Sequence, residues 1–87
     1  MRPVVVYKEF SDQAREVFEW IDQFEKRTGR TVEQLDPETP EGEIFCSARD
    51  ILQFPAVVVC DDDGKTYEQW IGQPMPQIDT VVAYVVN

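Results

Sequence analysis

The sequence has no histidine and only two cysteines, Cys46 and Cys60. Histidine is the commonest general base near neutral pH and the commonest metal ligand. Its absence argues against a zinc site and against a serine nucleophile that depends on an adjacent base. The two cysteines form neither a CxxC pair nor a dense disulfide framework, so free thiols in a reducing cytoplasm are the default. We therefore expect no metal and no cofactor, and the composition argues against an enzyme.

Basic side chains and long apolar runs are also scarce. Eight Lys and Arg face seventeen Asp and Glu, which gives a net charge of −9. Nucleic-acid binding depends on cations against phosphates, and an anionic membrane surface repels an acidic chain, so neither partner is expected. The longest apolar run, residues 56–60, is far too short to span a membrane, and no secretory signal is visible. We expect a cytoplasmic domain whose acidity serves solubility, with a basic partner as the alternative.

The first half of the chain reads as strand, helix and strand. Residues 2–7 contain a continuous apolar run opened by Pro3, typical of a strand buried on both faces. Ser11 is expected to cap the N-terminus of the following helix, and Gly29 is expected to end it in a left-handed conformation. Residues 31–35 then form a short strand. The expected buried face of the helix, at spacings of three and four, consists of Ala14, Val17, Phe18, Ile21 and Phe24, with Trp20 beside them.

The second half reads as helix, two strands and helix. Thr39 before Pro40 suits a helix N-cap, and Pro55 is expected to end that second helix. Residues 56–60 and 65–71 are strands joined by a hairpin at Asp61–Gly64, a segment without the ligand spacing of a calcium loop. The expected buried positions are Ile44, Ala48, Ile51 and Leu52 in the second helix, and Ile78, Val81, Val82 and Val85 in the third.

This order predicts a single α/β domain over residues 1–87. The elements follow as β-α-β-α-β-β-α, in which the first two strands flank a crossover helix and should be parallel. The tight turn between the last two strands makes that pair antiparallel. A mixed four-stranded sheet with helices on both faces follows.

The order of elements, with a proline before the third strand, resembles the thioredoxin family over nearly the whole chain. Three stretches are similar: residues 4–10 to the first strand and the approach to the active site, residues 51–59 to the segment around the family's cis-proline, and residues 63–72 to the closing hairpin. The resemblance implies a thioredoxin-like fold and a cis peptide bond between Phe54 and Pro55. The simpler alternative is that Pro55 only ends a helix and begins an ordinary strand.

The chain departs from the family at the reactive positions. Ser11-Asp12-Gln13-Ala14 stands where the family has CxxC, and Val5 stands in place of its buried acid. Disulfide exchange requires a thiolate that attacks sulfur and a second thiol that releases the mixed disulfide. The resemblance therefore implies a member without redox activity.

Residues that match the family's substrate groove are retained. The resemblance implies that they form an apolar patch around Pro55 that binds a protein or peptide. The alternative is that they only close the top of the core. These residues are Tyr7, Phe10, Ser11, Phe54, Pro55, Ile71 and Gly72.

Two further functions stay open. Cys46 lies near the expected start of the second helix, where the helix N-terminus favours a thiolate, so a single-cysteine reductase or sensor is the alternative function. A buried cysteine that acts as a small apolar residue is the simpler interpretation, and Cys46 and Cys60 should be too far apart for a disulfide. The third possible function is assembly into a homodimer, through the edge of the fourth strand or through the apolar patch.

Overall fold

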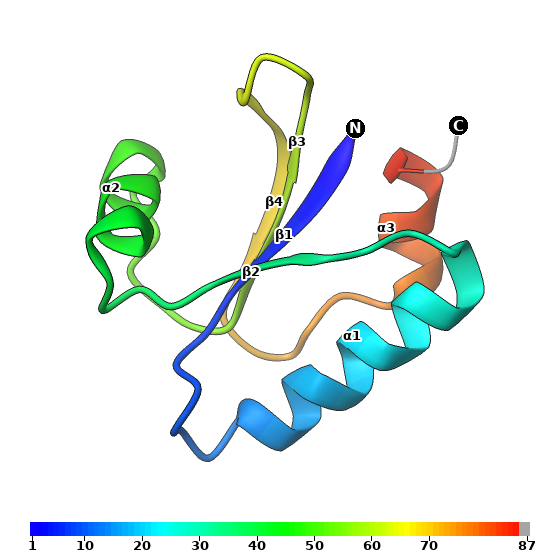
Figure 1. Cartoon of the computed structure of the whole chain (residues 1–87), viewed down its shortest axis with the longest axis horizontal. Helices are drawn as coiled ribbons and strands as arrows, with labels where there is room; N and C mark the ends of the chain where they lie inside the picture. The colour runs from blue at the N-terminus through cyan, green and yellow to red at the C-terminus, as the bar shows by residue number, and fades with distance from the viewer. Residues whose placement is uncertain (86–87) are drawn as a thin grey trace.

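Seven elements follow one another in the predicted order in the computed structural model, which describes residues 1–85. Residues 86 and 87 of the expected domain lie outside the described part. Figure 1 shows the elements: β1 Arg2–Val6, α1 Ala14–Thr28, β2 Glu33–Leu35, α2 Pro40–Arg49, β3 Ala56–Cys60, β4 Thr66–Ile71 and α3 Ile78–Val85.

The four strands form one mixed sheet in the order β2-β1-β3-β4. β1 is parallel to β2, and β3 is antiparallel to both β1 and β4. Val6 at the end of β1 lies opposite Ala56 at the start of β3, and Ile71 at the end of β4 lies opposite Ala56 as well. The pairing therefore brings the segment after β1, the segment before β3 and the segment after β4 to the same end of the sheet.

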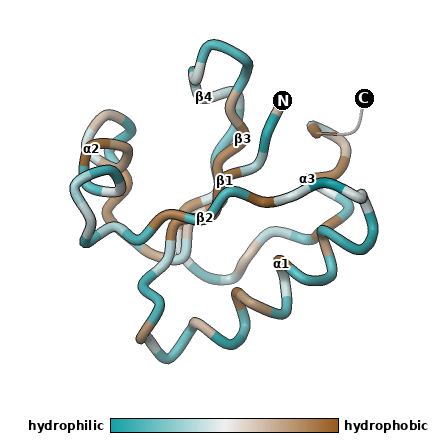
Figure 2. The backbone as a smooth tube through the Cα atoms, in the orientation of Figure 1, coloured by the Kyte–Doolittle hydropathy of each residue, from teal (hydrophilic) through white to brown (hydrophobic). Residues whose placement is uncertain are grey.

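Helices cover both faces of the sheet, as predicted. In Figure 1, α2 lies on one side, and α1 and α3 lie on the other. Side chains of a strand alternate between the two faces. Val57 and Val59 accordingly pack in the core with α1 and α3, whereas Val58 and Cys60 pack in the core with α2. All five residues of β3 are buried, which explains their continuous apolar sequence. Figure 2 shows this apolar strand near the centre of the molecule.

The buried face of α1 differs from the prediction at Phe18. This side chain is half exposed, whereas Trp20, which was expected beside the stripe, is buried. The Trp20 ring stacks on Phe24 with 5.3 Å between ring centroids, and its Nε1 donates a hydrogen bond to the Pro76 carbonyl oxygen at 2.8 Å. The helix is thus rotated toward α3 and the segment before it. Gly29 ends the helix as predicted, with a φ of 70°.

The start of α2 agrees with the prediction, but its end does not. Thr39 caps the helix, because its hydroxyl oxygen accepts a hydrogen bond from the Gly42 amide at 3.1 Å. The helix ends at Arg49, where Asp50 adopts a left-handed conformation with a φ of 56°, and not at Pro55. The buried residues Ile51 and Pro55 therefore belong to the loop that leads into β3.

The predicted buried face of α2 is correct at Ile51 and wrong at its three other positions. Ile44 is 71% exposed, Leu52 is 86% exposed and Ala48 is also exposed. The residues of α2 that are buried are Gly42 and Cys46. The helix therefore lies on the sheet through its two small residues and turns its larger aliphatic side chains to solvent.

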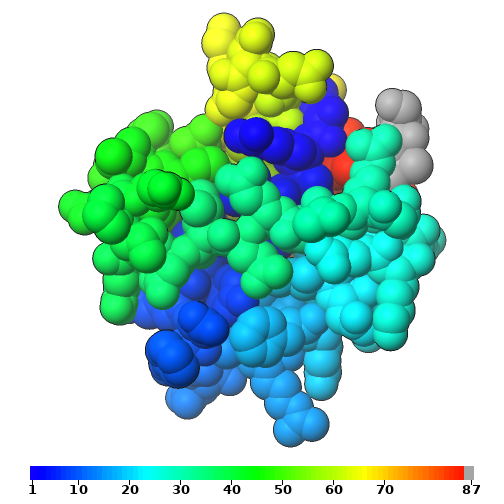
Figure 3. Space-filling model, viewed as in Figure 1, coloured from blue at the N-terminus to red at the C-terminus, as the bar shows by residue number. Residues whose placement is uncertain are grey.

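The hairpin between β3 and β4 forms at Asp61–Gly64, as predicted. The Asp61 carboxylate accepts hydrogen bonds from the amides of Asp63 and Lys65, and Gly64 has a φ of 83°. Figure 3 shows the tip, in yellow, projecting from the molecule. Among residues 1–85, no three acidic, cysteine or histidine side chains are grouped to hold a metal ion. In the same range, no helix combines the length and the apolar character needed to cross a membrane.

Candidate functional site

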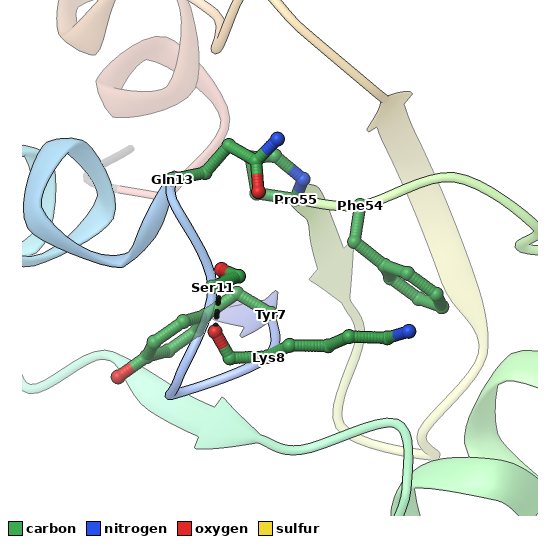
Figure 4. Close-up of a pocket in the computed structure, with 6 residues that line it drawn as sticks. All are labelled: Tyr7, Lys8, Ser11, Gln13, Phe54 and Pro55. Carbon is green, nitrogen blue, oxygen red and sulfur yellow. Dashed lines mark hydrogen bonds between the residues drawn. The ribbon is translucent and has the colours of Figure 1, made fainter.

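A pocket of about 170 Å³ opens at the end of the sheet where β1 stops and β3 begins. Pockets that hold a drug-sized molecule are roughly 300–1,000 Å³, so this one has room for a single side chain. Four of the seven predicted site residues line it, together with two that were not predicted. Figure 4 shows the six: Tyr7, Lys8, Ser11, Gln13, Phe54 and Pro55. We call this the Pro55 pocket.

Pro55 is buried, and its backbone is hydrogen-bonded to the residue that follows β4. The Phe54–Pro55 peptide bond is cis, as the resemblance implies. The Pro55 carbonyl oxygen accepts a hydrogen bond from the Gly72 amide at 2.9 Å. Gly72 has a φ of 82°, and a β-carbon there would lie 2.7 Å from the side-chain oxygen of Gln53. The Gln53 side chain can move away, so it is the positive φ that favours glycine beside Pro55.

Ser11 lies in the pocket wall, but it is not the predicted helix cap. α1 begins at Ala14, and Gln13 occupies the N-cap position without a side-chain hydrogen bond. The Ser11 hydroxyl instead donates to the Lys8 carbonyl oxygen at 2.7 Å, the dashed line in Figure 4. The Ser11 carbonyl oxygen accepts from the Ala14 amide at 3.2 Å. Residues 8–14 thus fold into consecutive turns before the helix starts.

Tyr7 forms a buried wall of the pocket. Its hydroxyl donates to the Gln34 side-chain oxygen at 2.7 Å, and its ring meets the Phe18 ring edge-on at 5.6 Å between centroids. Burial raises the pKa of the Tyr7 phenol, and the nearby carboxylates of Glu9 and Asp36 raise it further. The phenol is therefore a neutral hydrogen-bond donor over the physiological pH range.

Lys8 and Phe54 separate the Pro55 pocket from the surface beside α2. The Lys8 ammonium lies 6.0 Å from the centroid of the Phe54 ring, at the outer limit of a cation–π contact. It also lies 3.6 Å from a carboxylate oxygen of Glu38. Neither Lys8 nor Gln13 was predicted as a site residue, although Lys8 belongs to a stretch that carries the family resemblance and Gln13 stands within the segment that replaces the family's CxxC.

The predicted apolar patch is divided in the structure. Phe10 is 97% exposed and does not line the Pro55 pocket. Ile71 and Gly72 flank Pro55 from the end of β4 and are not part of the pocket wall either. The structure thus gathers Tyr7, Ser11, Phe54 and Pro55, while the part that any of the seven plays in binding stays a prediction.

Two of the three positions that match the family's reactive groups, Val5 and Ala14, hold buried, non-ionisable side chains. Val5 is fully buried and packs in the core with α1, and Ala14 is buried at the start of that helix. Neither side chain can gain or lose a proton. The polar groups among the residues that line the Pro55 pocket are the hydroxyls of Tyr7 and Ser11, the Gln13 amide and the Lys8 ammonium, and none of the six lining residues has a thiol.

Cys46 is 6% exposed and does not lie at a helix N-terminus. Its carbonyl oxygen accepts the amides of Asp50 and Ile51, which places it in the last turns of α2. Burial raises the pKa of the Cys46 thiol, and the opposing effect of Arg49 is smaller. Cys60 is fully buried, and both cysteines are free.

Comparison with known proteins identifies the fold. No protein-family model and no curated protein sequence matches the chain. Among solved structures, the chain is similar to thioredoxin 1 from the thermophilic eubacterium Thermosipho africanus TCF52B, with a TM-score of 0.69 and 13% sequence identity. The match covers 99% of this chain and 91% of that one. Identity this low shows the fold alone, and the chain therefore has a thioredoxin-like fold.

Proposed function

We propose that this chain is a redox-inactive thioredoxin-like domain that binds an extended segment of a protein or peptide at the Pro55 pocket. The observation that carries the proposal is that Tyr7, Ser11, Phe54 and Pro55, from two separate parts of the sequence, line one pocket. Its volume suits one side chain of a bound segment. Two rings and a proline supply apolar walls, while Lys8 and Gln13 add hydrogen-bond donors.

Redox inactivity is inferred from the side chains that replace the thiols. Disulfide exchange needs a thiolate nucleophile, and the Ser11 hydroxyl is already engaged by the Lys8 carbonyl oxygen. The burial and raised pKa of Cys46 argue against the alternative of a single-cysteine reductase or sensor. Two free cysteines suit a reducing compartment, and we place the domain in the cytoplasm.

The test begins with peptides selected from a display library against the native chain. Their affinities are then measured for two variants: Ser11→Trp, which fills the pocket, and Phe54→Glu, which puts a charge in its wall. Tyr67→Glu is the matched control, because Tyr67 is an exposed aromatic residue outside the pocket. We expect both pocket variants to lower affinity about tenfold or more and the control to leave it unchanged. Equal binding by all three folded variants would contradict the proposal.

A further inference from the structure

The outer surface of α2 carries apolar side chains that the fold leaves uncovered. Pro40, Ile44 and Ala48 follow one another at spacings of four along the helix, and the exposed Leu52 lies in the loop after it. Monomeric proteins rarely expose contiguous apolar patches unless these bind something. We call the surface formed by Pro40, Glu43, Ile44, Ser47, Ala48 and Leu52 the α2 face.

Two hollows lie on the α2 face, on either side of a ridge formed by Glu43 and Ser47. One, of about 570 Å³, is lined by Pro40, Ile44 and Ala48 together with the ridge. The other, of about 470 Å³, reaches from the ridge to Leu52 and has Cys46 among its lining residues. Rows of side chains at spacings of four with grooves between them are the surface against which a second helix packs.

The charge around these hollows is negative. Glu43 and Asp50 line the second hollow, and neither forms an ion pair with a cation among residues 1–85. Lys8, which lines the same hollow, is engaged by Glu38.

The cation of α2 itself is directed away from the face. The Arg49 guanidinium lies 3.7 Å from the centroid of the Phe45 ring and donates hydrogen bonds to the Gly64 carbonyl oxygen and the Thr66 hydroxyl oxygen. It is thus held against the β3–β4 hairpin. The α2 face therefore combines apolar hollows with carboxylates that nothing in the described part of the chain neutralises.

From these observations we propose that the α2 face binds an amphipathic helix of a partner protein whose apolar stripe is flanked by Lys and Arg. The apolar side chains fill the two hollows, and the cations lie against Glu43 and Asp50. A second copy of this chain is a poor occupant, because its net charge of −9 would set like charges against each other. The proposal goes beyond the proposed function, since none of the six residues of the α2 face lines the Pro55 pocket.

The probe is a fluorescein-labelled peptide of Leu and Lys, with the leucines at spacings of three and four, and its affinity is measured by fluorescence anisotropy. We expect Ile44→Ser and Leu52→Ser each to weaken binding about tenfold, because each removes one apolar side chain from the interface. Both residues are exposed, so the variants should fold, which circular dichroism checks. A peptide with Glu in place of Lys should not bind.

Two charge variants distinguish the effect of a charge on the α2 face from the effect of the net charge of the protein. Glu43→Lys alters the α2 face, and Asp62→Lys alters the exposed hairpin tip, while each raises the net charge from −9 to −7. We expect Glu43→Lys to weaken binding several-fold more than Asp62→Lys, with the difference shrinking as salt is added. Equal weakening by the two variants would overturn the proposal, because attraction would then follow net charge alone.

Four other results would also overturn it. The peptide could fail to bind, or bind Leu52→Ser as tightly as the native chain. The native chain could self-associate in sedimentation velocity with Leu52→Ser restoring the monomer, which would make a second copy the occupant. Finally, Ser11→Trp could abolish binding while the α2-face variants leave it intact; that result would place the peptide in the Pro55 pocket and leave the proposed function standing.

Discussion

The backbone carbonyl of Asp36 lies directly against the α-carbon of Gly42, so that a β-carbon on Gly42 would overlap with it. This contact seats the first turn of α2 on the loop that follows β2. The neighbouring Thr39 cap, whose hydroxyl also donates to the Asp36 carbonyl oxygen at 2.7 Å, strengthens the same junction. The position of α2, and with it the α2 face, therefore depends on a glycine that the sequence pattern alone presents as a weakness in the helix.

Gly42→Ala should destabilise the protein strongly. The overlap is with backbone atoms, which cannot rotate away, so the helix has to shift. We expect the free energy of unfolding to fall by about 2–3 kcal/mol. Gly29→Ala is the matched control: Gly29 has a φ of 70° but open space around it, so only the strained φ costs about 1 kcal/mol. Urea unfolding measures both, and a smaller loss for Gly42→Ala than for Gly29→Ala would contradict the close contact.

Stability should fall in alkaline solution because of Tyr7. Its pKa is raised above the ordinary value of 10.0, mainly by burial, so the folded state favours the neutral phenol. A group whose pKa is raised on folding contributes stability that is complete below its unfolded pKa and is lost as the pH rises through the folded pKa. The urea midpoint of the native chain should therefore drop more steeply above pH 10 than that of Tyr7→Phe. Parallel curves for the two proteins would show that Tyr7 does not cause the loss.

Cys46 should react slowly with alkylating reagents. Burial raises the pKa of its thiol and limits access, and only the thiolate is nucleophilic. We expect the rate of iodoacetamide labelling at Cys46, followed by peptide mass spectrometry, to be far below the rate in urea at the same pH. The rate should also rise with pH later than for an unfolded cysteine. Fast labelling near neutral pH would instead favour the single-cysteine redox function.

Much of the fold is predictable because two features indicate its strands: their apolar composition, and the proline and turn residues that flank them. β3 has the predicted bounds, since Pro55 and the Asp61 turn enclose a run of apolar residues that suits a strand buried on both faces. The site residues were predicted from the family resemblance, because the antiparallel pairing of β1 with β3, which brings the end of β1 beside Pro55, was not predicted from the residues themselves. Phe10 lies outside the Pro55 pocket because turns between residues 8 and 14 leave its side chain exposed, and its part in binding stays a prediction.

The orientation of α2 could not be predicted from its apolar periodicity. The spacing identifies Ile44 and Ala48 as members of one stripe, but it does not say whether the same chain or a partner covers that stripe. The end of the helix was not predicted either, because the residue that ends it in a left-handed conformation is Asp50, whereas glycine usually occupies such a position. Both errors concern the surface that we propose as an interface. At an interface, apolar spacing can reflect contact with a partner, so it need not predict which residues the isolated chain buries.

The native chain should not reduce disulfides, but its backbone should still accommodate a CxxC pair. In an insulin reduction assay with dithiothreitol, we expect no acceleration over dithiothreitol alone, since Ser11 and Ala14 hold no thiol. The hydrogen bond from the Ala14 amide to the Ser11 carbonyl oxygen defines a turn whose end α-carbons lie within about 7 Å, the reach of a disulfide.

The double variant Ser11→Cys/Ala14→Cys should therefore form a disulfide on mild oxidation, which thiol titration would show as the loss of two of its four thiols. Ser11→Cys alone is the control and should keep all its thiols, because Cys46 and Cys60 are buried. A double variant that keeps four free thiols would contradict the turn geometry. Acceleration of insulin reduction by the native chain would contradict redox inactivity itself, because it would show that the family chemistry survives without the paired cysteines.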